Sequence, residues 1–123
     1  MTKSMMILIA GPYRSGTGDD PEKMQNNLER LERAAWPIFE KGHVPMIGEW
    51  AELPILRSGG GGVPGSARYE AVMYPTAHRL LGRCGGVLRL PGASAGADND
   101  VRIAKKRGIP IWSDIAEIPS AND

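Results

Sequence analysis

An uninterrupted apolar run, Met5 to Ala10, is followed directly by a loop rich in glycine and proline. A run of this length and character is typical of a strand that is buried on both faces, as in a parallel sheet. The loop, Gly11 to Gly18, contains too much Gly and Pro to be regular, and Asp20-Pro21 then predicts the start of a helix. This order of strand, loop and helix indicates an α/β protein.

The same alternation continues along the chain. Apolar residues at spacings of three and four predict a helix from Asp20 to Gly42 that is kinked at Pro37. The other predicted strands are 43–47, 86–90 and 109–112, and the other predicted helices are 69–83, which Pro75 splits, and 97–107. Pro45 favours an edge position for strand 43–47. We expect a short helix broken by Pro54 at 49–56, a terminal turn or helix at 113–118, and a frayed end at 120–123.

These elements predict one domain over residues 1–123, with an open parallel sheet of four to five strands and helices on both faces, flavodoxin-like or Rossmann-like in outline. A chain of 123 residues can bury one sizeable core but not two. In such sheets a ligand binds beyond the carboxyl ends of the strands, where the strand order reverses. If the first and third strands are neighbours, the loops that follow them converge on one cleft.

Composition excludes several classes of function. The net charge of +1 and the scattered basic residues do not support binding to a nucleic-acid polymer. The single cysteine, Cys84, excludes an internal disulfide and a Cys-rich zinc site, and His43 and His78 do not form a metal-binding pair. The apolar run is too short for a signal peptide or a membrane span, so we expect a cytoplasmic protein without a membrane partner.

The loop after the third predicted strand, Pro91 to Asp100, is a Gly/Ser-rich turn that opens a helix with carboxylates in its first turn. The N–H groups at a helix start are unpaired and lie at the positive end of the helix dipole, so they suit an anion. Ser94 is suited to cap this helix. Asp98 and Asp100 then either complement the dipole or supply a nucleophile, because a carboxylate at this place stays ionised.

The loop after the first predicted strand spaces Gly11 and Gly16 like a phosphate loop, but the required Lys-Ser/Thr does not follow. No G-x-G-x-x-G run is present either, so nucleotide triphosphatase and dehydrogenase functions are disfavoured. What this loop offers is an aromatic ring (Tyr13), a guanidinium that can hold a phosphate (Arg14) and a hydroxyl (Ser15). The alternative is a solvated loop whose tyrosine packs on the core.

Two further segments are relevant to a site. Glu49 and Glu52 follow the second predicted strand, so they also lie at a carboxyl end and can touch a substrate. The segment Ser58 to Gly65 has four consecutive glycines, Gly59 to Gly62, and cannot pack as a regular element. It is either a mobile lid or a loop tip.

Three motifs carry a family resemblance over almost the whole chain, weakest in Leu53 to Ala67. The first strand ends in Ile9-Ala10-Gly11-Pro12-Tyr13, and Lys41-Gly42 is followed by His43-Val44-Pro45. The most specific motif runs from Leu88-Arg89-Leu90-Pro91-Gly92 into Ser94-x-Gly96-x-x-x-Asp100-x-x-x-Ala104 and Gly108-Ile109-Pro110. Together they resemble the nucleoside 2-deoxyribosyltransferase-like superfamily, which includes the 2′-deoxynucleoside 5′-phosphate N-glycosidases.

This resemblance implies cleavage or transfer of the N-glycosidic bond of a deoxynucleoside or its 5′-monophosphate, without a metal or an organic cofactor. Asp100 takes the place of the carboxylate that attacks the anomeric carbon, and Tyr13 takes the place of the tyrosine that steadies it. The resemblance also implies a small-molecule nucleoside or nucleotide as the partner, and a homodimer. The implied ligand cradle consists of Gly11, Arg14, Ser15, Ser94, Gly96 and Asp98.

Two positions differ from the family pattern. Asp100 stands where most members have glutamate, which shortens the reach of the carboxylate by more than ~1 Å. Many members also carry an aspartate near Thr76 to His78 that helps to protonate or orient the base, and this chain has none there, with His78 as the nearest substitute. The alternative function is therefore a non-catalytic nucleotide-binding or nucleotide-sugar-binding protein, and a third possibility is a structural protein whose loops bind nothing.

Overall fold

Four parallel strands form the centre of the protein in the computed structural model, which describes residues 2–121. The strands are β1 (Met6–Ala10), β2 (Val44–Ile47), β3 (Gly86–Arg89) and β4 (Ile111–Trp112), in the order β2-β1-β3-β4. Strand β2 therefore lies on one side of β1, and β3 and then β4 lie on the other side. This confirms the predicted open parallel sheet, the edge position of β2 and the α/β class.

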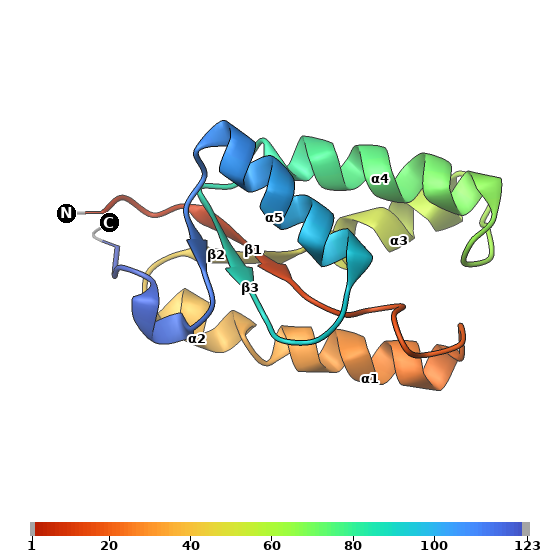
Figure 1. Cartoon of the computed structure of the whole chain (residues 1–123), viewed down its shortest axis with the longest axis horizontal. Coiled ribbons are helices and arrows are strands. Elements are labelled where there is room, and N and C mark those ends of the chain that lie inside the picture. Colours follow the sequence, from red (N-terminus) through yellow and green to blue (C-terminus); the bar gives the residue numbers. More distant parts are fainter. Residues whose placement is uncertain (1, 122–123) are drawn as a thin grey trace.

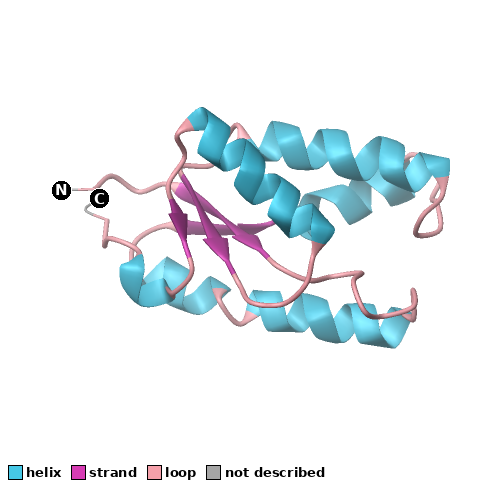
Figure 2. Ribbon diagram, viewed as in Figure 1, coloured by secondary structure: helices cyan, strands magenta, loops and turns pink. Residues whose placement is uncertain are grey.

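Helices cover both faces of the sheet, as Figures 1 and 2 show. One face carries α1 (Pro21–Glu32) and α2 (Ala35–Glu40), and the other carries α3 (Gly48–Ser58), α4 (Ala67–Leu81) and α5 (Ala95–Arg107). A short 3-10 helix, Ile115–Glu117, follows β4 and is closed by a capping box between Asp114 and Glu117.

The apolar run of β1 is divided between two cores, one on each face of the sheet. Ile7 and Ile9 are at most 2% exposed and pack with apolar residues of α1 and α2, whereas Leu8 and Ala10 are at most 4% exposed and pack with α4 and α5. Successive side chains of a strand point to opposite faces, so a strand covered on both sides must be apolar throughout. This explains why β1 has no alternation of polar residues.

The helix predicted from Asp20 to Gly42 is in fact two helices, α1 and α2, separated at Arg33-Ala34. Pro37 lies in the first turn of α2, where its missing N–H costs nothing. A continuous helix would have required an N–H at Pro37 for the carbonyl of Arg33, and the proline ring would have clashed with that carbonyl. The chain therefore breaks one turn before the proline instead of kinking at it.

The breaks predicted at Pro54 and Pro75 are wrong, because α3 and α4 run through these residues. Both prolines lie on exposed positions of their helices. A carbonyl freed on the solvent side can bond to water, so the lost hydrogen bond is tolerated. Packing of α3 against α4 further stabilises both helices.

The glycine-rich segment after Ser58 connects α3 to α4. Its first turn is held by a hydrogen bond of 2.7 Å from the Arg68 guanidinium to the carbonyl of Gly59. At its other end Gly65 lies against Arg14, since a Cβ atom at Gly65 would lie 2.7 Å from Nη2 of that arginine. Ser66 then caps α4 by accepting a hydrogen bond from the N–H of Tyr69.

The two ends of the described chain lie together at the amino ends of the strands (Figure 1). Thr2 pairs with Ala121 in a parallel bridge, and the N–H of Ala121 donates to the carbonyl of Lys41 at 2.7 Å. The frayed end predicted from Ser120 is therefore wrong for Ala121, and residues 122–123 lie outside the described residues. Among residues 2–121, no helix is long and apolar enough to cross a membrane.

Candidate active site

The loops after β1 and β3 converge, as the strand order requires. The N–H of Leu90 donates to the carbonyl of Ala10 at 2.8 Å, which extends the pairing of β1 and β3 into the loops. Further on, a Cβ atom at Gly92 would lie 2.7 Å from Cγ of Pro12, and Gly92 has a φ of +116°. Glycine is therefore required where the two loops touch. The predicted cleft lies at this topological switch point.

A cavity of about 450 Å³ opens at this point. Its walls come from the end of β1 and the loop after it, the first turns of α3, one side of α4 and the beginning of α5. Seven of the eight site residues predicted from the sequence line it: Gly11, Tyr13, Arg14, Ser15, Ser94, Gly96 and Asp100. The topology thus brings together side chains that are up to 89 residues apart in the chain, from Gly11 to Asp100.

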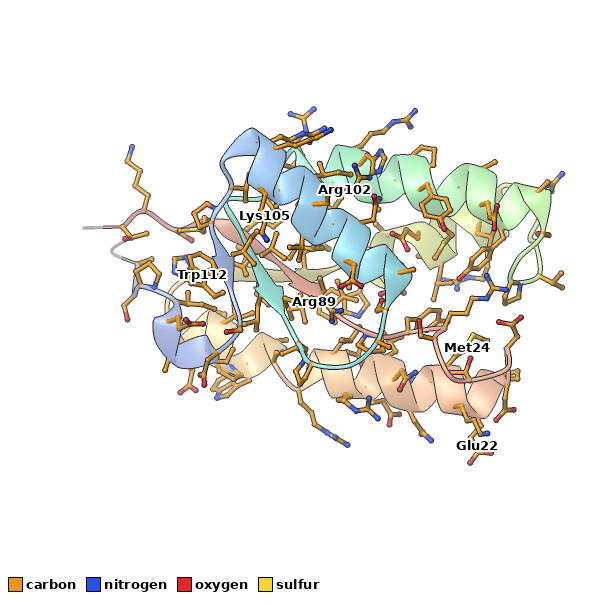
Figure 3. All side chains as sticks on the ribbon, viewed as in Figure 1. Glu22, Met24, Arg89, Arg102, Lys105 and Trp112 are labelled. Carbon is orange, nitrogen blue, oxygen red and sulfur yellow. The ribbon has the colours of Figure 1, made fainter. Side chains whose placement is uncertain are left out.

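Asp98, the eighth predicted residue, lies outside this cavity. Its side chain is 73% exposed and accepts a hydrogen bond of 2.9 Å from Arg89. Arg89 lies at the end of β3, beneath the beginning of α5 (Figure 3). Asp98 therefore ties the first turn of α5 to the sheet.

The helix that carries Asp100 starts two residues earlier than predicted. Ser94 is the N-cap, as expected, and its hydroxyl accepts a hydrogen bond of 3.1 Å from the N–H of Ala97. Asp98 consequently lies in the first turn of α5 and Asp100 in the second. The prediction of a first-turn carboxylate is wrong for Asp100, and the influence of the helix dipole has largely faded at its position.

The pKa of Asp100 depends mainly on burial. Burial raises the pKa to about 6, while the positive charge of Arg89 acts in the opposite direction. A carboxyl with this pKa is ionised at neutral pH, so Asp100 can act as a nucleophile there. Burial also removes water that would otherwise solvate the carboxylate.

The loop after β1 is anchored on both sides. The amide of Asn27 in α1 donates to the carbonyl of Tyr13 at 2.8 Å. The guanidinium of Arg14 donates to Asp19 at 2.6 and 3.2 Å and lies over the ring of Tyr69, 5.6 Å from its centre. The arginine that we expected to hold a phosphate is thus already oriented, with its fork paired to a carboxylate.

Two glutamates of α3, Glu49 and the buried Glu52, form a second acidic feature. Both Glu49 and Glu52 line the cavity, and Glu52 is only 4% exposed. Burial raises the pKa of Glu49 to about 7 and that of Glu52 to about 9, and the charge of Asp100 adds to both increases. A hydrogen bond joins the two carboxyl groups.

No family model, curated protein or solved structure matches this chain. What the site can do therefore follows from its own side chains. It combines an ionised carboxylate, a pair of carboxyl groups that share a proton, and an aromatic wall. Within residues 2–121, no group of three or more His, Cys, Asp or Glu side chains is arranged to hold a metal ion.

The α4 wall was not predicted as part of a site. It includes a stripe of Tyr69, Met73, Ala77 and Leu80, whose spacings of four, four and three place them on one side of the helix, and Glu70 and Tyr74 line the cavity beside this stripe. Tyr69 is 7% exposed, and burial raises its pKa to about 12. The sequence shows this stripe once residues 69–83 are taken as a helix that lies beside the carboxyl ends of the strands.

His78 does not line the cavity. Its ring nitrogen lies 3.3 Å from the amide nitrogen of Asn99, and Asn99 itself lines the cavity. Ala77 occupies the neighbouring position in the wall. His78 therefore does not take the place of the aspartate that the family pattern has near this position.

Proposed function

We propose that this protein cleaves or transfers the N-glycosidic bond of a deoxynucleoside or its 5′-monophosphate, with Asp100 as the nucleophile. The observation that carries the proposal is the position of Asp100, a half-buried carboxylate that is ionised at neutral pH and lines a cavity of about 450 Å³ between the loops after β1 and β3. The resemblance to the nucleoside 2-deoxyribosyltransferase-like superfamily supports the same role.

The chemistry follows from the surroundings of Asp100. Its carboxylate oxygen attacks C1′ of the sugar, the base departs, and the glycosyl-enzyme is resolved by water or by a second base. Burial and the charges of Glu49 and Glu52 raise the pKa of Tyr13, so its hydroxyl stays protonated and can donate a hydrogen bond to the carboxylate. The ring of Tyr69 offers the base an aromatic surface.

A 5′-phosphate would bind at the loop side of the cavity. There the hydroxyl of Ser15 and the exposed backbone at Gly96 line the cavity, and a Cβ atom at Gly96 would meet nothing within 4 Å. Arg14 would reach the same group by exchanging its pairing with Asp19 for the phosphate.

The test is to incubate the protein with a panel of deoxynucleosides and their 5′-monophosphates and to measure by chromatography the free base that is released. We expect base release by the wild type and a loss of ~10³-fold or more in Asp100→Asn, because the nucleophile is removed while the shape is kept. Asp98→Asn is the matched control, since this neighbouring carboxylate lies outside the cavity, and it should keep the wild-type rate. A sharp increase in Asp100→Glu would show that the short side chain limits turnover.

A non-catalytic nucleotide-binding protein is the second candidate, favoured by the aspartate at position 100 where the family mostly has glutamate. It predicts saturable binding without base release in both the wild type and Asp100→Glu. A structural protein would show no thermal shift, whereas a ligand at 100 times its dissociation constant adds about 2.7 kcal/mol of stability.

We further propose that the protein is a homodimer. The support comes from α2, where Trp36 and Phe39 are 64% and 58% exposed and stack on each other with ring centres 5.4 Å apart. Val44, on the edge strand β2, is 49% exposed. Exposed aromatic side chains of this size are typical of protein interfaces.

A further inference from the structure

The departing base needs a proton, and His78 is not placed to supply it. When the C1′–N bond breaks, its electron pair goes to the base, and a base that leaves as an anion leaves slowly. His78 does not line the cavity, because Asn99 and Ala77 occupy the wall beside it. An acid for this step must therefore be sought among the side chains that line the cavity.

Glu52 is the most informative side chain for this question. It is 96% buried, since 4% of its surface is exposed, and it lines the cavity. The hydrogen bond found for its carboxyl, within residues 2–121, joins it to Glu49 and not to an N–H group or a hydroxyl. A buried carboxyl that faces a cavity without a donor of its own is costly unless a ligand or a proton satisfies it.

Two carboxyl groups can share a hydrogen bond only when one of them carries a proton. The Glu49–Glu52 pair is therefore a store for one proton inside the cavity, comparable with other carboxyl dyads that titrate as a unit. The hydrogen bond between the two carboxyl groups raises the pKa of Glu52, which reaches about 9, and lowers that of Glu49, which burial nevertheless raises to about 7, so Glu52 is the donor in the pair and Glu49 the acceptor. Glu49 is therefore the group that gains and loses its proton near neutral pH. Both residues line the cavity, and Glu49 has the more exposed surface of the two.

The remaining acids of the cavity are poorer candidates. Asp19 is held by Arg14 at 2.6 Å and is exposed, and Glu70 is also exposed. The pKa of Tyr69 is raised to about 12, so its phenol is a weak acid at neutral pH. Asp100 must be ionised to attack.

We propose that Glu49 is the catalytic acid of the reaction, giving its own proton to the departing base, and that Glu52 is a positioning residue whose carboxyl O–H donates to the Glu49 carboxyl and orients it. The inference rests on the proposed function. As an oxygen of Asp100 bonds to C1′, the C1′–N bond breaks and the base takes both its electron pair and the proton of Glu49. In the second step the Glu49 carboxylate takes a proton from water, whose oxygen bonds to C1′ as the bond to Asp100 breaks.

The experiment compares two leaving groups on the same sugar phosphate. One substrate is the deoxynucleoside 5′-monophosphate that the wild type cleaves fastest, and the other is 4-nitrophenyl 2-deoxyribose 5-phosphate. Because 4-nitrophenolate is a stable anion, it leaves without a proton. The first turnover is followed for both, so that only the bond-breaking step is measured.

We expect Glu49→Gln to slow base release by ~10²–10⁴-fold, the range for loss of a general acid, and to slow the nitrophenolate burst by less than about tenfold. Asp100→Asn should abolish both. Glu22→Gln removes an exposed carboxylate of α1, remote from the cavity (Figure 3), and should change neither. A retained burst also shows that the site of Glu49→Gln is folded.

Glu52→Gln and Glu52→Leu together test the positioning role. The amide N–H of Gln keeps a donor to the Glu49 carboxyl, so base release should keep the alkaline limb of the wild type, whereas Leu removes the donor and should move this limb to higher pH. A structural role would lower the rate without moving this limb. The other charged and titratable groups around the cavity, unchanged in these variants, are Tyr13, Arg14 and Asp19 after β1, Tyr69, Glu70 and Tyr74 on α4, and Asp100 on α5.

The two proposals fail in different ways. If the wild type releases neither base nor nitrophenolate, N-glycosidic cleavage is refuted and the acid with it. If the wild type releases both and Glu49→Gln slows both equally, or slows neither, Asp100 keeps its role and the assignment of Glu49 is wrong.

Discussion

Asp98 and Asp100 lie two residues apart on α5 but on opposite sides of the helix. Two residues correspond to about 200° of rotation, so only one of the pair can face the cavity. Asp98 is exposed and paired with Arg89, whereas Asp100 is half-buried in the cavity wall, and its pKa is raised to about 6. The position of a carboxyl on the helix therefore decides between a structural and a chemical role.

The buried glutamates should make stability depend on pH. The pKa of Glu52 rises from 4.5 in the ordinary state to about 9 in the folded protein, so the folded state binds more protons over this interval. The free energy of unfolding should therefore fall as pH rises from about 5 to 9, with Glu49 and Asp100 contributing in the same direction. Urea unfolding at a series of pH values measures this.

Glu52→Gln should remove much of this dependence and raise stability at pH 9 by ~1–3 kcal/mol, the cost of a buried group without a donor. Glu22→Gln serves as the control for loss of one negative charge. If the free energy of unfolding depended on pH equally in the wild type and in Glu52→Gln, the burial of an ionisable pair would be contradicted.

A site residue could be predicted when its position depends on the sequence immediately around it. Ser94 and Tyr13 were found because a cap and a post-strand loop are local patterns. Asp98 was placed in the site because the resemblance includes it in the ligand cradle, but its side chain lies outside the cavity and pairs with Arg89. The burial of Glu52 could not be predicted, since it depends on how α3 packs against the sheet and α4.

At the level of elements, the contact between Gly92 and Pro12 holds the two site loops together. Gly92→Ala should destabilise the protein by ~1–2 kcal/mol from its positive φ and by a further ~1–3 kcal/mol from the clash with Pro12. Gly108→Ala, at φ +69° with nothing within 4 Å, is the matched control and should show only the first cost. Thermal unfolding of both variants measures the difference, and equal losses would mean that the loops tolerate separation.

The three helical prolines show where element prediction reaches its limit. Pro37 ends one helix and starts another, while Pro54 and Pro75 are accommodated. The residue type is the same in each case, and the difference lies in which side of the helix faces water and what packs on the other side. Neither the side of a helix that faces water nor the element packed on its other side can be determined from the residues next to the proline in the sequence.

At the level of the whole molecule, the burial of β1 on both faces was predictable because this strand is apolar throughout. The order of the strands was not predicted, and the cleft was expected only on the condition that the first and third strands are neighbours. The order β2-β1-β3-β4 meets this condition. The volume and the walls of the cavity depend on side-chain packing between helices and could not be predicted in this way.

The proposed dimer is tested by mass in solution. We expect light scattering to give twice the chain mass of 13.3 kDa for the wild type and a shift towards the monomer in Trp36→Ser/Phe39→Ser. Val63→Ser is the control, because Val63 is 72% exposed but lies on the connection between α3 and α4, at the other end of the molecule (Figure 1). A wild-type mass of 13.3 kDa would exclude the dimer, and a change in the control would exclude α2 as its specific interface.

The bridge between Thr2 and Ala121 gives the polypeptide nearly the connectivity of a ring. A peptide linker across the ~5 Å between paired residues would complete this ring, and new ends could then be opened in the glycine-rich segment after Ser58. Such a circular permutation changes the order in which the elements are synthesised without moving any wall of the cavity. The architecture of the site is thus independent of where the polypeptide is cut.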